Sequence, residues 1–219
     1  KICMFLNFSV SLWVWSLFFF FLTYEKTTAL FFVRLCYVGT IFLPALFFHF
    51  ITSLFKFQKK VLLWVFYGLS LTLLVFDFTP LLIKDVRPIL SFRYYGIPGP
   101  VYPFYTVFLI GIITYSHYIL INYFKESEGQ TRNQIKYLLF ATVIGFFGGA
   151  TTFLPVFKIE IFPFGFYLVS IYVLITSYAI AKHRLMDINV VLKKGTTYVL
   201  LMLLLFIPSF LLIVLTQKM

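Results

Sequence analysis

The chain has 219 residues, of which 62% are hydrophobic and 11% are charged, and its formal net charge at pH 7 is +11. Soluble domains are about one quarter charged, so this composition excludes a water-soluble protein and indicates an integral membrane protein. The basic residues lie between apolar runs, where they orient a membrane protein, and we therefore expect membrane lipids and not nucleic acid as a partner.

Seven stretches of the chain are long and apolar enough to cross a bilayer, which needs about 20 residues of helix. They are roughly residues 2–23, 29–55, 61–83, 104–124, 137–157, 162–181 and 196–217. The alternating pattern of a membrane β-barrel is absent, so a bundle of helices is the remaining way to span lipid. We expect an all-α, polytopic transmembrane bundle with about seven membrane-spanning helices.

The longest connection between these stretches, residues 84–103, has four prolines and two glycines. Such a composition disfavours a continuous helix, so we predict an ordered loop outside the membrane. Its tyrosines Tyr94, Tyr95 and Tyr102 are expected at the level of the lipid headgroups. Within the apolar stretches, Pro44 and Pro155 are expected to kink their helices.

Basic residues are distributed unequally between the two sets of connecting loops. The richer set holds Lys56, Lys59, Lys60, Lys125, Arg132, Lys136, Lys182, Arg184, Lys193 and Lys194, and the other holds Lys26, Lys84, Arg87, Arg93 and Lys158. The richer side is expected to be cytoplasmic. This predicts a multi-pass protein of the plasma membrane whose N-terminus is cytoplasmic and whose loop 84–103 is outside.

No familiar catalytic motif is present, and the three histidines His49, His117 and His183 lack the spacing of metal ligands. We therefore expect no catalytic residue, no cofactor and no metal site. Cys3 and Cys36 both lie in apolar runs and form neither a metal motif nor an expected disulfide.

Ionisable residues inside apolar stretches are the first candidates for a sensing site. Arg34 and Asp77 lie near the same end of successive antiparallel helices and are expected at similar depth. Alternatively, Arg34 extends to the headgroups and Asp77 faces the outer interface alone. His49 and His117 are further candidates. For His117, the alternative is a neutral histidine that bonds a serine or tyrosine hydroxyl inside the bundle and is purely structural.

Two other segments have a distinctive pattern. The glycines of "GFFGG", residues 145–149, favour the close approach of two helices. In residues 182–194, "KHRLMDINVVLKK", the apolar residues could form one face of an interfacial helix, with Lys182, Arg184, Lys193 and Lys194 toward anionic headgroups. We identify His183, Arg184 and Asp187 there as candidates for relaying a signal, with a plain anchoring loop as the alternative.

Four blocks of sequence resemble, in order and spacing, the N-terminal seven-transmembrane sensor region of bacterial histidine kinases. They are "LFFVRLCYVGTIFLPALFFHF" (30–50), "PGPVYPFY" (98–105), "TRNQIKYLLFATVIGFFGGATTFLP" (131–155) and "YAIAKHRLMDINVVLKKG" (178–195). The resemblance implies a sensor bundle over residues 1–195, in which the first helix of the family is missing, and an additional transmembrane helix over residues 196–219.

The resemblance implies a sensory input module of a two-component signalling protein, which relays a stimulus by helix displacement to a cytoplasmic output domain. None of the three histidines stands in a phospho-acceptor context and no nucleotide-binding motif follows, so we expect this sensor fragment of a parent histidine kinase not to be an enzyme. A small hydrophobic molecule, a lipid or a peptide are compatible ligands, and a homodimer is a compatible assembly. The alternatives are a small transporter or permease fragment and a structural membrane subunit.

Overall fold

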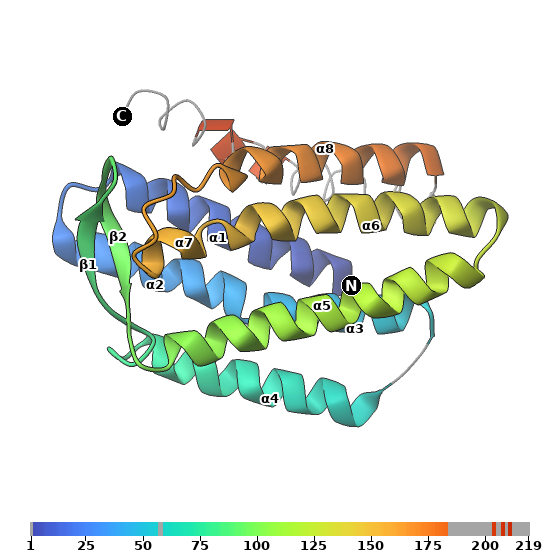
Figure 1. The fold of residues 1–219 in the computed structure, drawn as a ribbon, viewed down its shortest axis with the longest axis horizontal. Helices are drawn as coiled ribbons and strands as arrows, with labels where there is room; N and C mark the ends of the chain where they lie inside the picture. Colours follow the sequence, from blue (N-terminus) through green and yellow to red (C-terminus); the bar gives the residue numbers. More distant parts are fainter. Residues whose placement is uncertain (1, 57–58, 184–202, 205–206, 209, 212–219) are drawn as a thin grey trace. The chain divides into compact units, whose positions relative to one another are not determined.

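The computed structural model describes residues 2–56, 59–183, 203–204, 207–208 and 210–211. It divides into two compact units, which are described separately. The first comprises Lys1–Ser116 and Pro155–Ile161, and the second comprises His117–Leu154 and Phe162–Met219. The ribbon in Figure 1 follows their elements in chain order.

The first unit begins with two antiparallel helices, α1 (Ile2–Leu22) and α2 (Lys26–Ile41), that pack tightly along their length. Their closest approach is at Gly39, where a Cβ atom would lie 2.7 Å from the carbonyl oxygen of Ser9 and 2.9 Å from the nitrogen of Trp13. Glycine is thus required at this position because any side chain would push the two helices apart.

The helix α2 passes into α3 (Leu43–Leu54) through a break at Phe42. Pro44 lies in the first turn of α3, where its missing N–H leaves no hydrogen bond unmade. The two helices together form one stretch long enough to cross a membrane. The interruption expected at Pro44 is therefore confirmed. The chain continues into α4 (Lys60–Asp77), which packs against α2 and α3.

A β-hairpin follows, where sequence analysis predicted a loop. Strands β1 (Ile83–Ile89) and β2 (Phe92–Pro98) pair antiparallel, and Figure 1 shows them at the end of the unit where α1 passes into α2. Buried side chains recur at every third position through the hairpin, and they are Ile83, Val86, Ile89, Phe92 and Tyr95. The hairpin thus has an apolar face that packs against α1 and α2.

Two of the three tyrosines predicted at the level of the headgroups are buried inside the protein. Tyr95 is 5% exposed and Tyr102 is 0% exposed, because both pack into the protein instead of facing its surroundings. Tyr102 is the first residue of α5 (Tyr102–Glu126), the helix that leaves the hairpin. Burial raises the pKa of Tyr95, which lies on β2 outside the membrane-spanning helices.

The base of the hairpin is hydrogen-bonded to the segment that follows α4. The N–H of Gly99 donates to the carbonyl of Leu82 at 2.8 Å, and the N–H of Val101 donates to that of Leu81 at 3.0 Å. A Cβ atom at Gly99 would collide with the carbonyl oxygens of Pro80 and Leu81. The segment that leaves α4 and the segment that enters α5 are therefore hydrogen-bonded to each other across the base of the hairpin.

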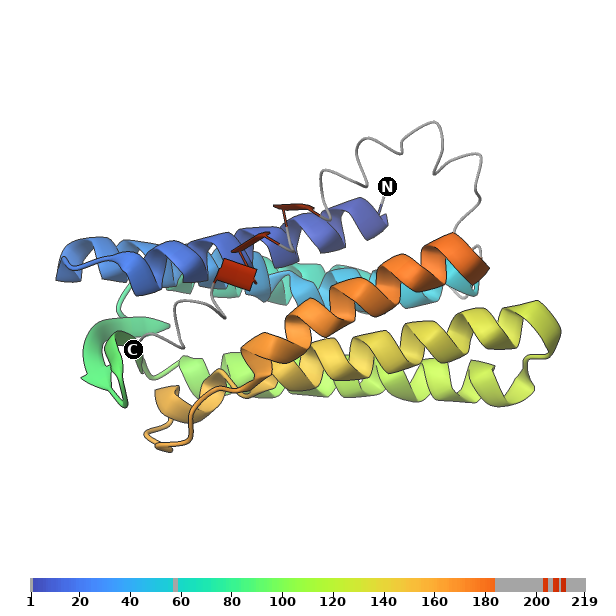
Figure 2. The same ribbon diagram turned by 90° about the horizontal axis from the view of Figure 1, so that it is seen from above.

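The second unit contains the end of α5 together with α6 (Gly129–Ala150), the start of α7 (Phe153–Val156) and α8 (Gly165–His183). Figures 1 and 2 show α6 and α8 side by side. A Cβ atom at Gly148 would lie 2.7 Å from the carbonyl oxygen of Gly165, and the N–H of Gly165 donates to Oγ1 of Thr151 at 3.1 Å. The close packing expected at the "GFFGG" segment is confirmed.

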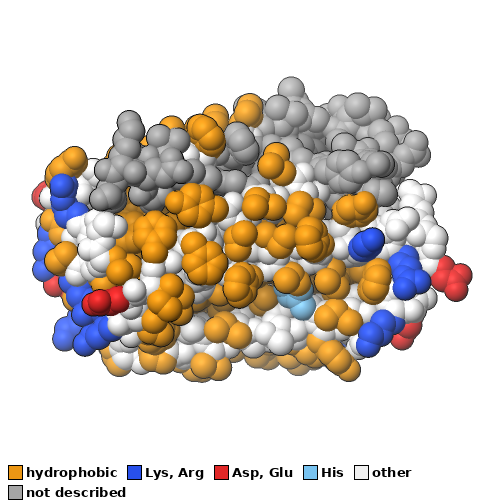
Figure 3. Space-filling view, turned by 45° about the horizontal axis from the view of Figure 1, so that its top comes forward, with side chains coloured by type: hydrophobic (Ala, Val, Ile, Leu, Met, Phe, Trp, Pro, Cys, Tyr) orange, Lys and Arg blue, Asp and Glu red, His pale blue; other side chains and the backbone are white. Residues whose placement is uncertain are grey.

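Five helical stretches in the described part of the chain are long and apolar enough to cross a membrane. They are Ile2–Leu22, Lys26–Leu54, Lys60–Asp77, Tyr102–Glu126 and Gly129–Val156, and a shorter apolar helix covers Gly165–Thr176. The helical membrane fold is confirmed, whereas the count of seven is not. The predicted helix at 196–217 falls largely outside the described residues, and Figure 3 shows apolar side chains along the helices in view.

Candidate functional site

The candidate site of the first unit is centred on the buried carboxyl group of Asp77. Asp77 is the last residue of α4 and is 0% exposed, and neither of its carboxyl oxygens has a hydrogen-bond partner among the described residues. Buried polar groups in native proteins are nearly always hydrogen-bonded, so an orphaned acid requires a physical explanation.

Arg34 is the cation that acts electrostatically on Asp77. It lies on α2 and its Nη2 atom donates to the carbonyl oxygen of Ile83, the first residue of β1, at 3.4 Å. Its Nε atom is buried and has no partner within the described part of the chain. The structure thus brings the two predicted residues into one region but leaves them without an ion pair within 4.0 Å. The burial of Asp77 argues against the alternative in which its side chain faces the outer interface.

A set of hydroxyl groups surrounds this region and joins α2 to the start of α5. The hydroxyls of Tyr37 and Tyr102 lie 2.9 Å apart, and the hydroxyl of Tyr105 donates to Oγ1 of Thr40 at 2.8 Å. Tyr102 and Tyr105 are both completely buried. Sequence analysis missed this network because 15 tyrosines are spread over the chain and nothing in their spacing singles out these.

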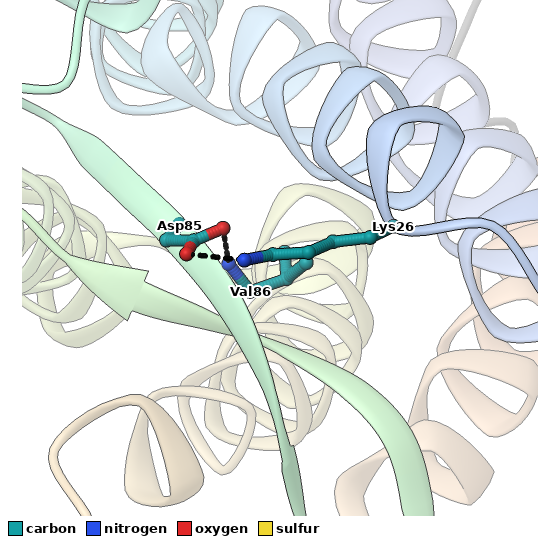
Figure 4. Close-up of polar contacts among 3 residues, drawn as sticks. All are labelled: Lys26, Asp85 and Val86. Atoms are coloured by element: carbon teal, nitrogen blue, oxygen red, sulfur yellow. Dashed lines mark hydrogen bonds and ion pairs between the residues drawn. The ribbon is translucent and has the colours of Figure 1, made fainter.

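The hairpin is fastened to the α1–α2 turn by polar contacts at its exposed edge. The Nζ atom of Lys26 lies 2.6 Å from Oδ2 of Asp85, and the N–H of Val86 donates to Oδ1 of the same carboxylate (Figure 4). These hydrogen bonds, the one from Lys26 foremost, hold the pKa of Asp85 below its usual value. The attachment is therefore charge-assisted.

A second group of contacts fastens β2 to the same turn. The guanidinium of Arg93 lies 3.8 Å from the ring centroid of Tyr24, and the hydroxyl of Tyr94 donates to the backbone carbonyl of Tyr24 at 3.1 Å. Below them, the rings of Phe21 and Phe92 stack with centroids 4.7 Å apart. Both strands of the hairpin are thus tied to the turn between α1 and α2.

The two intramembrane histidines belong to other places in the fold. Nδ1 of His49 lies 3.0 Å from the hydroxyl of Tyr67, and Nε2 of His117 lies 3.1 Å from Oγ1 of Thr142 in the second unit. His49 is about 20 Å from Arg34 along the α2–α3 axis. The partner of His117 is thus a threonine hydroxyl, not the expected serine or tyrosine, and His49 has a tyrosine hydroxyl beside it.

The candidate relay residues lie at the edge of what the structure describes. His183 is the last residue of α8, and Arg184 and Asp187 fall outside the described residues. Among the described residues, no three histidine, cysteine or acidic side chains gather where they could hold a metal ion. The geometry of the site therefore consists of the buried Asp77 carboxyl and the half-buried Arg34 near a hairpin that is anchored at both of its strands.

The described part of the chain, with five helical stretches long and apolar enough to cross a membrane and two ionisable residues near a hairpin, has the architecture of a polytopic helical membrane protein. The sequence matches, over residues 1–189, the family described as the N-terminal 7TM region of histidine kinase, and the chain belongs to this family. Comparison with curated proteins and with solved structures found no match. The chain is therefore a membrane-embedded sensor region of the histidine-kinase type, which is the sensory and not the catalytic part of such kinases.

Proposed function

We propose that this chain receives a stimulus at its hairpin end and relays it by helix displacement to a cytoplasmic output of the two-component type. The observation that carries this proposal is the connection between hairpin and helix. Only Gly99, Pro100 and Val101 separate β2 from α5, and two of these residues are hydrogen-bonded to the segment after α4. A displacement of the hairpin is thus passed to α5 with little slack.

The helix α5 provides a path away from the hairpin. It has 25 residues and is therefore about 37 Å long, which is enough to cross the hydrocarbon core. Packed helices shift by about 1–2 Å in known switches, and such a shift is well within what side chains can accommodate. A tenfold change in the population of two states needs only about 1.4 kcal/mol, so a small ligand or a single proton is a sufficient stimulus.

The orientation and the last step of the relay belong to the same proposal. The basic bias of the loops supports a cytoplasmic N-terminus and an outer position for the hairpin. His183, Arg184 and Asp187 then lie on the cytoplasmic side, where the chain leaves α8 toward the output. A homodimer would let the two copies respond together, and lipids are the surrounding partner.

The insertion of flexible residues between β2 and α5 tests the proposal. Residues 1–195 are fused in front of the dimerisation and ATP-binding domains of a histidine kinase, and two glycines are inserted between Gly99 and Pro100. We expect basal phosphorylation output to change while membrane abundance stays constant. The matched control inserts two glycines between Leu90 and Ser91, at the tip of the hairpin, and should leave output unchanged. Equal output from both variants and the parent would contradict the relay.

A further inference from the structure

We propose that Asp77 and Arg34 form a proton-controlled switch, in which an uncharged Asp77 leaves Arg34 bound to the hairpin and an ionised Asp77 draws it away. The proposal names the proton as a stimulus. The effect of the switch on kinase output rests on the proposed function. The switch itself involves only contacts within the first unit.

The environment of Asp77 favours the uncharged acid in the arrangement observed. The carboxyl is fully buried and none of its oxygens accepts a hydrogen bond from a described residue. A buried charge without a partner is far more costly than a buried neutral group without one. Asp77 also ends α4, where the backbone carbonyls of the helix disfavour a further negative charge.

Arg34 is the charged neighbour that can stabilise the ionised form. Among the described residues, the titratable groups that act electrostatically with Asp77 are Arg34 and Cys36 on α2 and Tyr105 on α5. The thiol and the phenol are neutral when protonated, so the guanidinium supplies the positive charge. Because it forms no ion pair with Asp77 in this arrangement, the attraction between the two groups is available to drive a rearrangement.

The present partner of Arg34 is a weak one. Its hydrogen bond to the carbonyl oxygen of Ile83 measures 3.4 Å, which is at the long end of the range for such bonds, and its Nε atom is unused. A carboxylate accepts two parallel hydrogen bonds from a guanidinium and binds it more strongly than a carbonyl does. Ionisation of Asp77 therefore favours transfer of Arg34 from Ile83 to Asp77.

Loss of the Arg34 contact would act on the hairpin directly. Ile83 is the first residue of β1, so the bond from Arg34 holds the start of the hairpin against α2. The uncharged acid and the attached hairpin are favoured at low pH, and a rise in pH favours the ion pair and the released hairpin. The step is a simple proton transfer from the Asp77 carboxyl to the surrounding water, and no other group is consumed.

Infrared spectroscopy of the full chain in lipid nanodiscs tests the protonation of Asp77. We expect the carbonyl stretch of a protonated, weakly hydrogen-bonded carboxyl at neutral pH, which disappears in Asp77→Asn and fades as pH is raised. Asp85→Asn is the matched control and should retain the band, because Asp85 is exposed and paired with Lys26. An identical spectrum for the parent and Asp77→Asn throughout the titration would overturn the proposal.

Hydrogen exchange of the amides in residues 83–89 tests the movement of Arg34. At each pH, the exchange rate of the parent is divided by that of Asp77→Asn. This ratio should rise about tenfold from low to high pH, as expected when an opening equilibrium shifts by one order of magnitude. Arg34→Gln should abolish this pH dependence. A ratio that does not change with pH would overturn the switch. If the switch operates but kinase output in the fused protein ignores pH, the proposed function fails and the switch stands.

Discussion

The ammonium group of Lys26 lies 2.6 Å from Oδ2 of Asp85, and this ion pair joins the first residue of α2 to β1. The two residues are 59 positions apart in the sequence. Both side chains are substantially exposed, with 58% and 38% of their surface accessible, so the pair is screened by solvent and salt. It contributes to the attachment of the hairpin and not to the core of the unit.

Replacement of Asp85 by asparagine should weaken this attachment in a pH-dependent way. Hydrogen bonds hold the pKa of Asp85 in the folded protein below its usual value. The ion pair therefore stabilises the fold fully at pH values above the pKa of the unfolded chain, which is about 3.9. This stabilisation is lost as the pH falls through the pKa of the folded protein. We expect Asp85→Asn to cost at most about 1 kcal/mol at pH 7 and nothing at strongly acid pH.

Thermal unfolding of parent and variant at several pH values measures this difference. Glu160→Gln is the control, because it removes an exposed carboxylate that has no ion pair within 4.0 Å among the described residues. High salt should reduce the effect of Asp85→Asn. A cost that stays constant down to acid pH would show that the ion pair is not its origin.

Gly99→Ala should disrupt the connection between hairpin and α5. The new methyl group would meet the carbonyl oxygens of Pro80 and Leu81, and these backbone atoms cannot move without breaking the hydrogen bonds of the hairpin base. We expect a loss of stability of about 1–3 kcal/mol, as for overpacking in a dense interior. Chemical unfolding in detergent gives the measurement.

The control for this substitution is Gly111→Ala in α5. A Cβ atom at Gly111 has nothing within 4 Å, and alanine favours a helix over glycine by about 1 kcal/mol in water. Gly111→Ala should therefore be neutral or stabilising. If both substitutions have the same effect, the collision at Gly99 does not decide its stability.

Single-cysteine labelling should show that the hairpin and the α5–α6 connection lie on opposite sides of the membrane. Ser91 is at the tip of the hairpin, and Ser127 lies between α5 and α6. In a background where Cys3 and Cys36 are replaced, we expect Ser91→Cys to react with an impermeant reagent from outside and Ser127→Cys only after permeabilisation. Reaction of both from outside in intact cells would refute the topology.

The helices of this protein follow from its apolar stretches, because lipid offers no hydrogen bonds and the backbone must satisfy its own. The boundaries do not follow. α6 begins at Gly129, eight residues before the predicted start at residue 137, because hydropathy marks the part of a helix that crosses the membrane and not the polar turns before it. The break before Pro44 was predictable, since proline lacks an N–H.

The hairpin was harder to predict from the sequence than the helices. Pro88 lies in β1 and Pro98 ends β2, and prolines ordinarily argue against strands. In a two-stranded sheet, however, each strand is an edge, and Pro88 falls at an irregularity between the pairs Arg87–Tyr95 and Ile89–Phe92, where no N–H is needed. The pairing depends on contacts with α1 and α2 that the local sequence does not contain.

The sequence alone determined that this is a helical membrane protein and that its chain resembles a kinase sensor region, and it predicted a similar depth for Arg34 and Asp77. Only the tertiary structure decided what those two residues touch. Depth follows from counting residues along each helix, but the direction of a side chain depends on how α2 and α4 rotate as their surfaces pack. That rotation buries the Asp77 carboxyl where no described residue bonds to it, and it directs Arg34 to the Ile83 carbonyl.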